Sequence, residues 1–322
     1  SEIALIMNYR KCYKLLIENG AQTYHVTKGR KIYDIEVLME SYESSDPEYL
    51  ELVNLVIEKT DPMMRFNSET YDIIKRCIIK RQKIVETFLL RFPNYVNATI
   101  DNITLLLLLI EVNEFESVEK IIKLKTTNLN PPDINTSYLS YCLVYGTINE
   151  KNNQIIEYLM KKAPKLIDKK SMDGRTCVDH VLLGYKSYTT ESCIRMIGLL
   201  MEKSKRGKDI LNNRNSMGFR TIETAIQFTD SDVINFLIDN GINFNEEMIE
   251  EYDHGSQIGN NDPLSFACQI NRPEIIETLL SRGITINTYN QIPIALLSAI
   301  SHNHHQAVNI LMSDPRIRQI CD

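Results

Sequence analysis

The stretch that decides the fold is NDPLSFACQINRPEIIETLLSRGITIN, which runs from Asn261 to Asn287. Asp262 is placed to cap a helix whose first residue is Pro263, where the missing N–H of proline costs nothing. Asn271 is predicted to end that helix in the left-handed conformation that Asn and Gly tolerate best. Pro273 then opens a second helix, which Gly283 closes. The stretch therefore predicts a helix, a tight turn, a second helix and an extended tail.

The end of this unit recurs elsewhere, at about thirty residues or small multiples of that spacing. The copies are KLLIENGA at Lys14–Ala21, NFLIDNGINFN at Asn235–Asn245 and TLLSRGITIN at Thr278–Asn287. Each copy ends an amphipathic helix at a glycine. A repeat of this length is typical of a stacked solenoid, in which each unit buries its apolar face against its neighbours. The 322-residue chain has room for roughly nine or ten such units.

The unit resembles the ankyrin repeat, whose pattern is loosely D-x-x-G-x-T-P-L-H-x-A-A, a Gly-ended turn, and I-V-x-x-L-L-x-x-G-A-x-x-N. The segments that carry the resemblance are DPLSFAC at Asp262–Cys268, DGRTCVDHV at Asp173–Val181, GFRTIETAI at Gly218–Ile226, DNITLLLLLIEVNEFESVEKIIKL at Asp101–Leu124, and ALLSAISHNHHQAVNILM at Ala295–Met312. Thr-Pro-Leu-His is eroded in all of them; Asp179 and Ser265, for example, stand in the His position. The resemblance implies an all-α, ankyrin-like helical solenoid of about nine degenerate repeats over residues 1–322, divergent in 1–172 and better matching in 173–322.

Composition and charge exclude several classes of protein. Apolar residues make up 43% of the chain and charged residues 24%, the balance of a folded, soluble protein. The net charge of −6 argues against a general polyanion-binding surface, so we expect no nucleic-acid partner. The longest apolar run, Leu105–Ile110, is far shorter than the roughly 18 residues that suggest a membrane span, so we expect no membrane insertion.

The seven cysteines are odd in number and scattered, which favours buried, reduced thiols over a disulfide framework. No cationic start followed by a long apolar stretch is present, so we expect no signal peptide. The expected location is therefore the cytoplasm, with the nucleus as the alternative.

Cys177, Asp179 and His180 are the first place to look for an enzyme. A thiol nucleophile needs a His within hydrogen-bond reach, and residues three apart on a helix share a face. The repeat pattern, however, places the same positions in the core and at the cap of a first helix. We favour that structural role, and expect no catalytic residue.

Two other clusters have a structural interpretation that is stronger than the chemical one. His302, His304 and His305 form the densest His cluster, but the residues between and after them are poor metal ligands, and Asn303-His304 stands where the family has its inter-helix turn. The basic segments KRCIIKRQK at 75–83 and KSKRGK at 203–208 lack interleaved aromatic residues, which favours a solvated helix end or loop. The motifs GxGxxG, GxxxxGKS and HExxH are absent, so we expect neither a cofactor nor a metal.

Several connectors are longer than the repeat requires and are rich in Gly, Pro or Asn. They are Gln22–Arg30, Asn128–Ser137, Lys203–Gly218 and Asn243–Asn261. In repeat proteins such insertions lie on one face, often the binding face, and aromatic residues anchor interfaces. The predicted partner-binding residues are the loop aromatics Tyr24, Phe66, Phe219, Tyr252 and Tyr289.

These observations predict a non-catalytic scaffold that binds a partner protein along its concave, loop-bearing surface. The divergent repeats also resemble those of ankyrin proteins from large DNA viruses, intracellular bacteria and protists, which implies a host protein as the partner. Two alternatives stay open: an enzyme or enzyme accessory with a Cys/His site in a repeat insertion, and a structural spacer in a larger complex. A binder should expose aromatic and Arg side chains on one face, an enzyme should enclose a Cys–His pair in a pocket, and a spacer should show neither.

Overall fold

The structure is a computed structural model that describes residues 10–27, 30–40, 46–61, 68–80, 84–97, 99–100, 103–112, 115–124, 127–129, 137–145, 150–245 and 262–321. The chain divides into two compact units, Ser1–Ile134 and Asn135–Asp322. The change from divergent to better-matching repeats that the sequence places at 172/173 falls inside the second unit. A single solenoid over the whole chain stays a prediction.

The first unit is built of short helices with two β-hairpins between them. Its elements are α2 (Arg10–Glu18), β1 (Tyr24–Thr27), β2 (Arg30–Tyr33), α3 (Asp34–Glu40), α4 (Pro47–Lys59), α5 (Ser68–Ile79), α6 (Ile84–Arg91), the 3₁₀ helix η1 (Pro93–Asn97), β3 (Thr99–Ile100), β4 (Ile103–Thr104), α7 (Leu105–Glu111) and α8 (Phe115–Ile122). Both hairpins are antiparallel, with Tyr24 opposite Tyr33 in the first and Thr99 opposite Thr104 in the second.

The second unit is also built of short helices, and its described residues include one β-hairpin. Its elements are α9 (Tyr138–Tyr145), α10 (Glu150–Lys162), η2 (Pro164–Leu166), α11 (Cys177–Leu183), η3 (Tyr185–Ser187), α12 (Thr190–Lys203), η4 (Gly207–Leu211), α13 (Thr221–Phe228), α14 (Ser231–Asp239), α15 (Pro263–Gln269), α16 (Pro273–Ser281), β5 (Thr288–Tyr289), β6 (Ile292–Pro293), α17 (Ile294–Ser301), α18 (His305–Ser313) and α19 (Pro315–Cys321).

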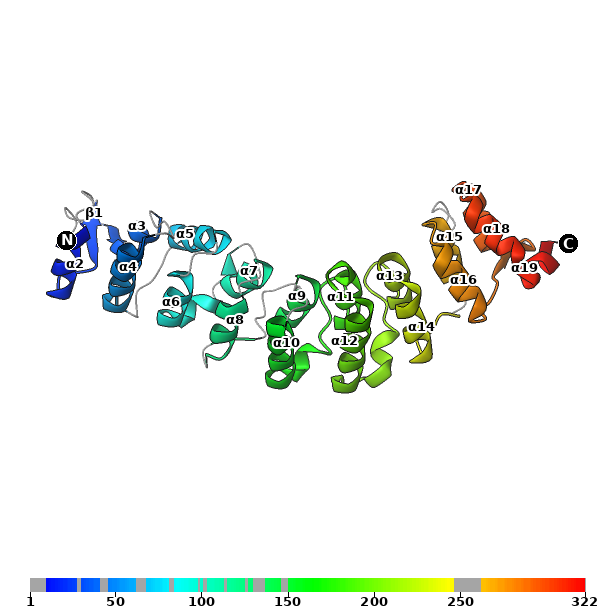
Figure 1. Ribbon diagram of the computed structural model, residues 1–322, viewed down its shortest axis with the longest axis horizontal. Helices are drawn as coiled ribbons and strands as arrows, with labels where there is room; N and C mark the ends of the chain where they lie inside the picture. Colours follow the sequence, from blue (N-terminus) through cyan, green and yellow to red (C-terminus); the bar gives the residue numbers. More distant parts are fainter. Residues whose placement is uncertain are drawn as a thin grey trace. The chain divides into compact units, whose positions relative to one another are not determined.

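Consecutive helices form pairs, and the pairs stack in two rows within each unit (Figure 1). In the second unit α9, α11, α13, α15 and α17 pack in order to form one row, while α12, α14, α16 and α18 form the other. In the first unit α3, α5 and α7 form one row, and α2, α4, α6 and α8 the other. Within the described residues this makes eight pairs, from α3–α4 to α17–α18, with α2 packed ahead of them. The prediction of all-α, ankyrin-like helix pairs that stack as a solenoid is therefore confirmed within each unit.

Burial in these rows explains the longest apolar run of the sequence. Every residue of Leu105–Ile110 is buried, because α7 contacts both its partner α8 and the neighbouring helix α5. The sequence of a helix that is covered on several sides is apolar throughout, whereas that of a half-exposed helix is amphipathic. Among the described residues, no helix combines the length and apolar character needed to cross a membrane.

The first helices are capped as the sequence predicts, although by unusual residues. The positions that hold Thr and His in the family pattern are filled in the second unit by polar pairs, of which only Thr176 keeps a family residue. The pairs are Ser137–Ser140, Thr176–Asp179, Arg220–Glu223 and Asp262–Ser265. In each case the two residues bond to each other across the first turn and satisfy a backbone N–H that the helix leaves unpaired.

The other ends of three of these helices, α9, α13 and α15, are capped by side chains of the next repeat, which bond to carbonyl oxygens near the helix end. The bonds join Tyr188 Oη to Leu143 O at 2.9 Å, Arg272 Nη1 to Ile226 O at 2.8 Å, and His304 Nδ1 to Cys268 O at 2.8 Å. The left-handed turns also form where the sequence places them: φ is 54° at Asn271 and 59° at Asn303. These contacts tie each repeat to its successor.

Candidate functional site

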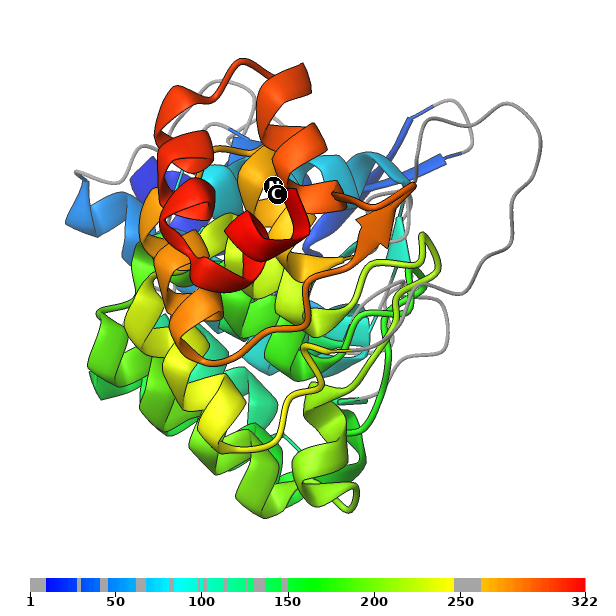
Figure 2. The ribbon, with the colours of Figure 1, turned by 90° about the vertical axis from the view of Figure 1, so that its right-hand side faces the viewer.

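Two connectors of the second unit end in tight turns that lie against each other. They are residues 171–175, which lead into α11, and residues 215–219, which lead into α13. The backbone N–H and the hydroxyl of Ser216 both donate to the carbonyl oxygen of Asp173, at 2.8 and 2.9 Å. A Cβ atom on Gly174 would lie 2.9 Å from the backbone nitrogen of Ser216, and φ at Gly174 is +78°, so this position requires glycine. We call three segments the fingers: these two turns and the β5–β6 hairpin, residues 288–293. Figure 2 shows the connectors on one side of the helices.

Hydrogen bonds inside each turn hold the fingers in one conformation. In the first turn, the N–H of Ser171 donates to the carbonyl oxygen of Arg175 at 3.0 Å. In the second, the buried side chain of Asn215 accepts from the N–H groups of Met217 and Phe219, at 2.9 and 3.0 Å. The fingers therefore present their side chains from a preorganised backbone, which lowers the entropy lost on binding.

The fingers carry exposed apolar side chains at their tips. Met172 is 75% exposed and Met217 is 73% exposed, on the two turns that touch. On the third finger, Tyr289 is 44% exposed. Phe219 is 40% exposed and sets its ring edge-on against Phe266 of the next repeat, 6.1 Å between centroids. Methionine adapts its shape to a partner, and a row of such side chains is typical of a protein-binding surface.

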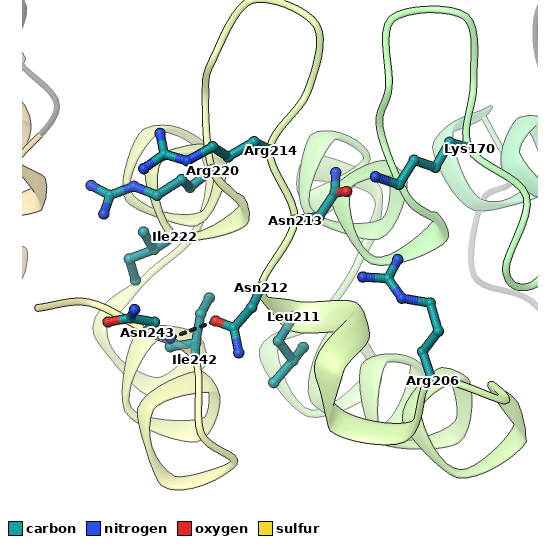
Figure 3. Close-up of a pocket in the computed structure, with 10 residues that line it drawn as sticks. All are labelled: Lys170, Arg206, Leu211, Asn212, Asn213, Arg214, Arg220, Ile222, Ile242 and Asn243. Atoms are coloured by element: carbon teal, nitrogen blue, oxygen red, sulfur yellow. Dashed lines mark hydrogen bonds between the residues drawn. The ribbon is translucent and has the colours of Figure 1, made fainter. Parts of the chain in front are cut away.

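A groove of about 490 Å³ runs along the connectors that lead to the two turns (Figure 3). Its lining residues are Lys170, Arg206, Leu211, Asn212, Asn213, Arg214, Arg220, Ile222, Ile242 and Asn243. Four of them are cationic and none is acidic. We call this the basic groove.

The four cations differ in how their charge is compensated. The guanidinium group of Arg220 is bound to the buried carboxylate of Glu223, at 2.7 Å. Arg206 donates to the backbone carbonyl oxygen of Asp209 at 3.0 Å. Arg214 donates to that of Gly218 at 3.2 Å, and its charge also favours the ionised form of Glu223. Among the described residues, exposed Lys170 has neither a hydrogen bond nor an ion pair.

The five aromatic residues predicted to bind a partner lie in different parts of the chain. Phe219 and Tyr289 lie on the fingers of the second unit. Tyr24 lies in strand β1 of the first unit, half-buried, with its ring 6.0 Å from that of Tyr33. Phe66 and Tyr252 lie outside the described residues. Partner binding by these residues stays a prediction.

The Cys177–His180 pair lacks the geometry of a catalytic site. The thiol of Cys177 is fully buried and donates to the carbonyl oxygen of Leu166 at 3.4 Å; burial raises its pKa to about 12. Neither ring nitrogen of His180 has a hydrogen-bond partner in the described part of the chain. Asp179 serves as the helix cap, where its carboxylate accepts from the N–H of Thr176 at 2.7 Å. The thiol therefore stays protonated and has no base beside it.

The histidine cluster has the structural role that the sequence favours. His304 caps the preceding repeat, and the ring of His302 stacks on it at 5.9 Å. Within the residues that the structure describes, no group of three His, Cys, Asp or Glu side chains is arranged to hold a metal ion. Of the basic segment 203–208, Lys203 pairs with Glu202, and Arg206 lines the basic groove.

Sequence reasoning missed the methionines of the fingers and the cations of the groove. A signal for the first exists: the two turns read SMDGRT at 171–176 and SMGFRT at 216–221, so each places Ser-Met at its start and a glycine after it. The predicted interface anchors were aromatic residues only, and so they did not include these two methionines.

No family model matches the sequence. Two curated proteins are similar to it, both ankyrin repeat proteins of Acanthamoeba polyphaga mimivirus. One is 28% identical over 198 residues, covering 56% of this chain and 22% of the relative; the other is 26% identical over 180 residues, covering 53% and 18%. The chain thus spans about a fifth of the length of these relatives. Among solved structures, the ankyrin repeat domain of human ASB11 matches 66% of this chain and 84% of its own, with 16% identity and a TM-score of 0.49.

Proposed function

Because the chain is a divergent ankyrin-repeat protein, we propose that it is a non-catalytic scaffold that binds a partner protein through the fingers of its second unit. The observation that carries the proposal is the exposure of Met172, Met217 and Tyr289 on turns that hydrogen bonds hold in place. Burial of one methionine side chain stabilises a complex by roughly 1.5–3 kcal/mol. Two methionines on turns that touch are therefore enough to serve as an energetic centre of an interface.

The alternatives have less support. An enzyme built on Cys177 would need a base beside the thiol, and His180 makes no hydrogen bond within the described residues. A spacer would have no use for exposed apolar tips beside a groove lined by cations. The finger surface favours a binder over both.

The relatives also support a proposal about the setting. Both are viral proteins, which supports a partner in the infected host cell. All seven cysteines are free, and five of them are buried. Free thiols are typical of reducing compartments, so the host cytoplasm is the proposed location.

The test is an affinity capture from host-cell lysate, analysed by mass spectrometry. The finger variant combines Met172→Ser, Met217→Ser and Tyr289→Ser, all at exposed positions. The control variant combines Ile300→Ser and Met312→Ser, exposed apolar residues of α17 and α18 outside the fingers. Circular dichroism confirms that each variant is folded.

A partner that the wild type and the control variant capture, and the finger variant loses, is the expected result. A partner captured equally by all three places the interface elsewhere and refutes the proposal. The absence of any specific partner refutes it as well and returns weight to the spacer hypothesis.

A further inference from the structure

We propose that Met172 and Met217 are sites of reversible oxidation to methionine sulfoxide, and that this modification weakens partner binding at the fingers. This inference rests on the proposed function, because it concerns the same two side chains. The oxidant is a peroxide. The thioether sulfur donates an electron pair to one peroxide oxygen and the O–O bond breaks. The departing oxygen takes up the proton of the transferred one, so that hydrogen peroxide yields the sulfoxide and water.

Exposure separates these two methionines from the others that the structure describes. Met172 is 75% exposed and Met217 is 73% exposed, whereas Met312 is 37% exposed. The remaining described methionines are each at most 9% exposed; they are Met39, Met160, Met196 and Met201. A peroxide must reach the sulfur atom in order to react, so the two finger methionines should be oxidised first.

The buried thiols of the second unit compete poorly for the same oxidant. Peroxides react with the thiolate rather than with the thiol. Burial raises the pKa of Cys142, Cys177 and Cys193 to about 12, and it raises the pKa of Cys268 as well. These side chains therefore stay protonated at neutral pH and are shielded from solvent. Among the described residues of this unit, the exposed thiol is that of Cys321.

The second finger has no free backbone donor for a sulfoxide oxygen. The N–H groups of residues 215–219 all donate to acceptors within the two turns, which are the carbonyl oxygens of Asp173, Asn215 and Phe219 and the side-chain oxygen of Asn215. A sulfoxide oxygen on Met217 therefore stays in solvent in the free protein. A partner that covers the finger must bury that oxygen, and a buried polar group without a hydrogen-bond partner costs free energy. Oxidation thus weakens the complex and leaves the fold intact.

The same exposure makes the change reversible. A sulfoxide on an exposed turn is accessible to a methionine sulfoxide reductase. Two thiols of the reducing system supply two electrons and become a disulfide, while the sulfoxide oxygen leaves as water. The finger methionines therefore regain their apolar side chains without unfolding of the repeat.

The first measurement maps the oxidation. The full chain, with the exposed thiols removed by Cys12→Ser and Cys321→Ser, is treated with hydrogen peroxide, and peptide mass spectrometry follows each methionine over time. We expect Met172 and Met217 to be oxidised at least about ten-fold faster than Met196 and Met201, with an unchanged circular dichroism spectrum and urea midpoint. Equal rates at the four positions, or loss of the fold with finger oxidation, overturn the inference.

The second measurement is capture of the partner from host-cell lysate at a series of bait concentrations, after the peroxide has been removed. One variant combines Met172→Leu and Met217→Leu, which keeps both tips apolar and prevents sulfoxide formation. The control Met312→Leu removes a methionine outside the fingers. An untreated variant with Met172→Gln and Met217→Gln reproduces the added polarity without any oxidation.

We expect oxidation to weaken capture by the wild type and by Met312→Leu at least about ten-fold, which is about 1.4 kcal/mol. The Leu variant should be insensitive to peroxide, and the Gln variant should resemble the oxidised wild type. Treatment with reductases for both sulfoxide epimers should restore capture. Equal losses in the wild type and the Leu variant would place the sensitive residue elsewhere and overturn the inference, as would full capture by a protein oxidised at both finger methionines.

The outcomes separate this inference from the proposed function. If the finger variant loses the partner but the oxidised wild type keeps it, oxidation does not control binding while the scaffold function stands. If no partner depends on the fingers, the scaffold function fails, and control of binding by oxidation fails with it.

Discussion

His180 is buried in α11 without a partner, and this makes the stability of the second unit dependent on pH. Its side chain is 6% exposed, and neither ring nitrogen has a hydrogen-bond partner among the described residues. The pKa of the imidazole is lowered from 6.5 to about 4, chiefly by burial; Asp173 opposes this shift and Arg175 adds to it. The folded protein therefore holds this histidine neutral.

The sign and size of the effect follow from the two pKa values. From about one pH unit above 6.5 the imidazole is neutral in both states, and His180 adds nothing to the pH dependence. As the pH falls, His180 binds a proton in the unfolded chain but not in the folded protein. The free energy of unfolding therefore falls until the pH reaches the pKa of His180 in the folded protein. Between about pH 7.5 and pH 5 the loss through this one group is about 2 kcal/mol.

The assay is urea unfolding followed by circular dichroism across this pH range, on the wild type and on His180→Leu and His180→Gln. Both variants remove the titration, but only one removes the buried polar group, so a shared change in slope identifies protonation as the cause. We expect the wild type to lose about 2 kcal/mol more than either variant between the two pH values. Parallel losses in all three proteins would show that His180 is not held neutral by burial.

Two further predictions concern the repeat junctions. Gly174→Ala should lower the free energy of unfolding by at least about 1–2 kcal/mol, and by more than Gly218→Ala, because both glycines have positive φ but only Gly174 meets the backbone of Ser216. Equal losses in urea unfolding would mean that the two turns do not touch. Glu223→Ala should cost about 3–5 kcal/mol, since it removes the carboxylate that pairs with the buried guanidinium group of Arg220; the double variant Arg220→Met with Glu223→Leu should cost less. A double variant as unstable as the single one would show that the ion pair itself, and not the buried charge that the single variant leaves behind, determines the stability.

The fold was predictable because local signals agree with packing. Asp262, Pro263, Asn271 and Gly283 each act as the sequence predicts, as cap, first residue, left-handed turn and helix end. The repeat period and the apolar faces then leave stacking as the way to bury each unit. The short hairpins β1–β2, β3–β4 and β5–β6 were not predicted, because two-residue and four-residue strands give no periodic signal.

The erosion of Thr-Pro-Leu-His shows which feature of a repeat is retained. Arg220 and Glu223 share no chemistry with Thr and His, yet they join the same two positions across the first turn of α13. The physical requirement is that a polar pair satisfies the backbone N–H groups at the helix start, and several pairs can meet it. A sequence comparison scores residue identity, whereas the fold requires only that the two positions form a polar pair. The repeat structure is therefore retained after the Thr-Pro-Leu-His motif is lost.

The site was less predictable for a related reason. The basic groove takes Lys170 from one connector, Arg206 and Arg214 from the next, and Asn243 from a third. These residues are too far apart in the sequence to form a recognisable motif. Each connector taken alone has the charge pattern of a solvated loop, and the groove exists only in the stacked repeats. The two exposed methionines are equally hard to predict, because the turns that carry them meet only through the contact between Gly174 and Ser216 of two different repeats. In a solenoid the scaffold is encoded within each repeat, but a binding surface is encoded between repeats, so it becomes visible only when neighbouring units are in place.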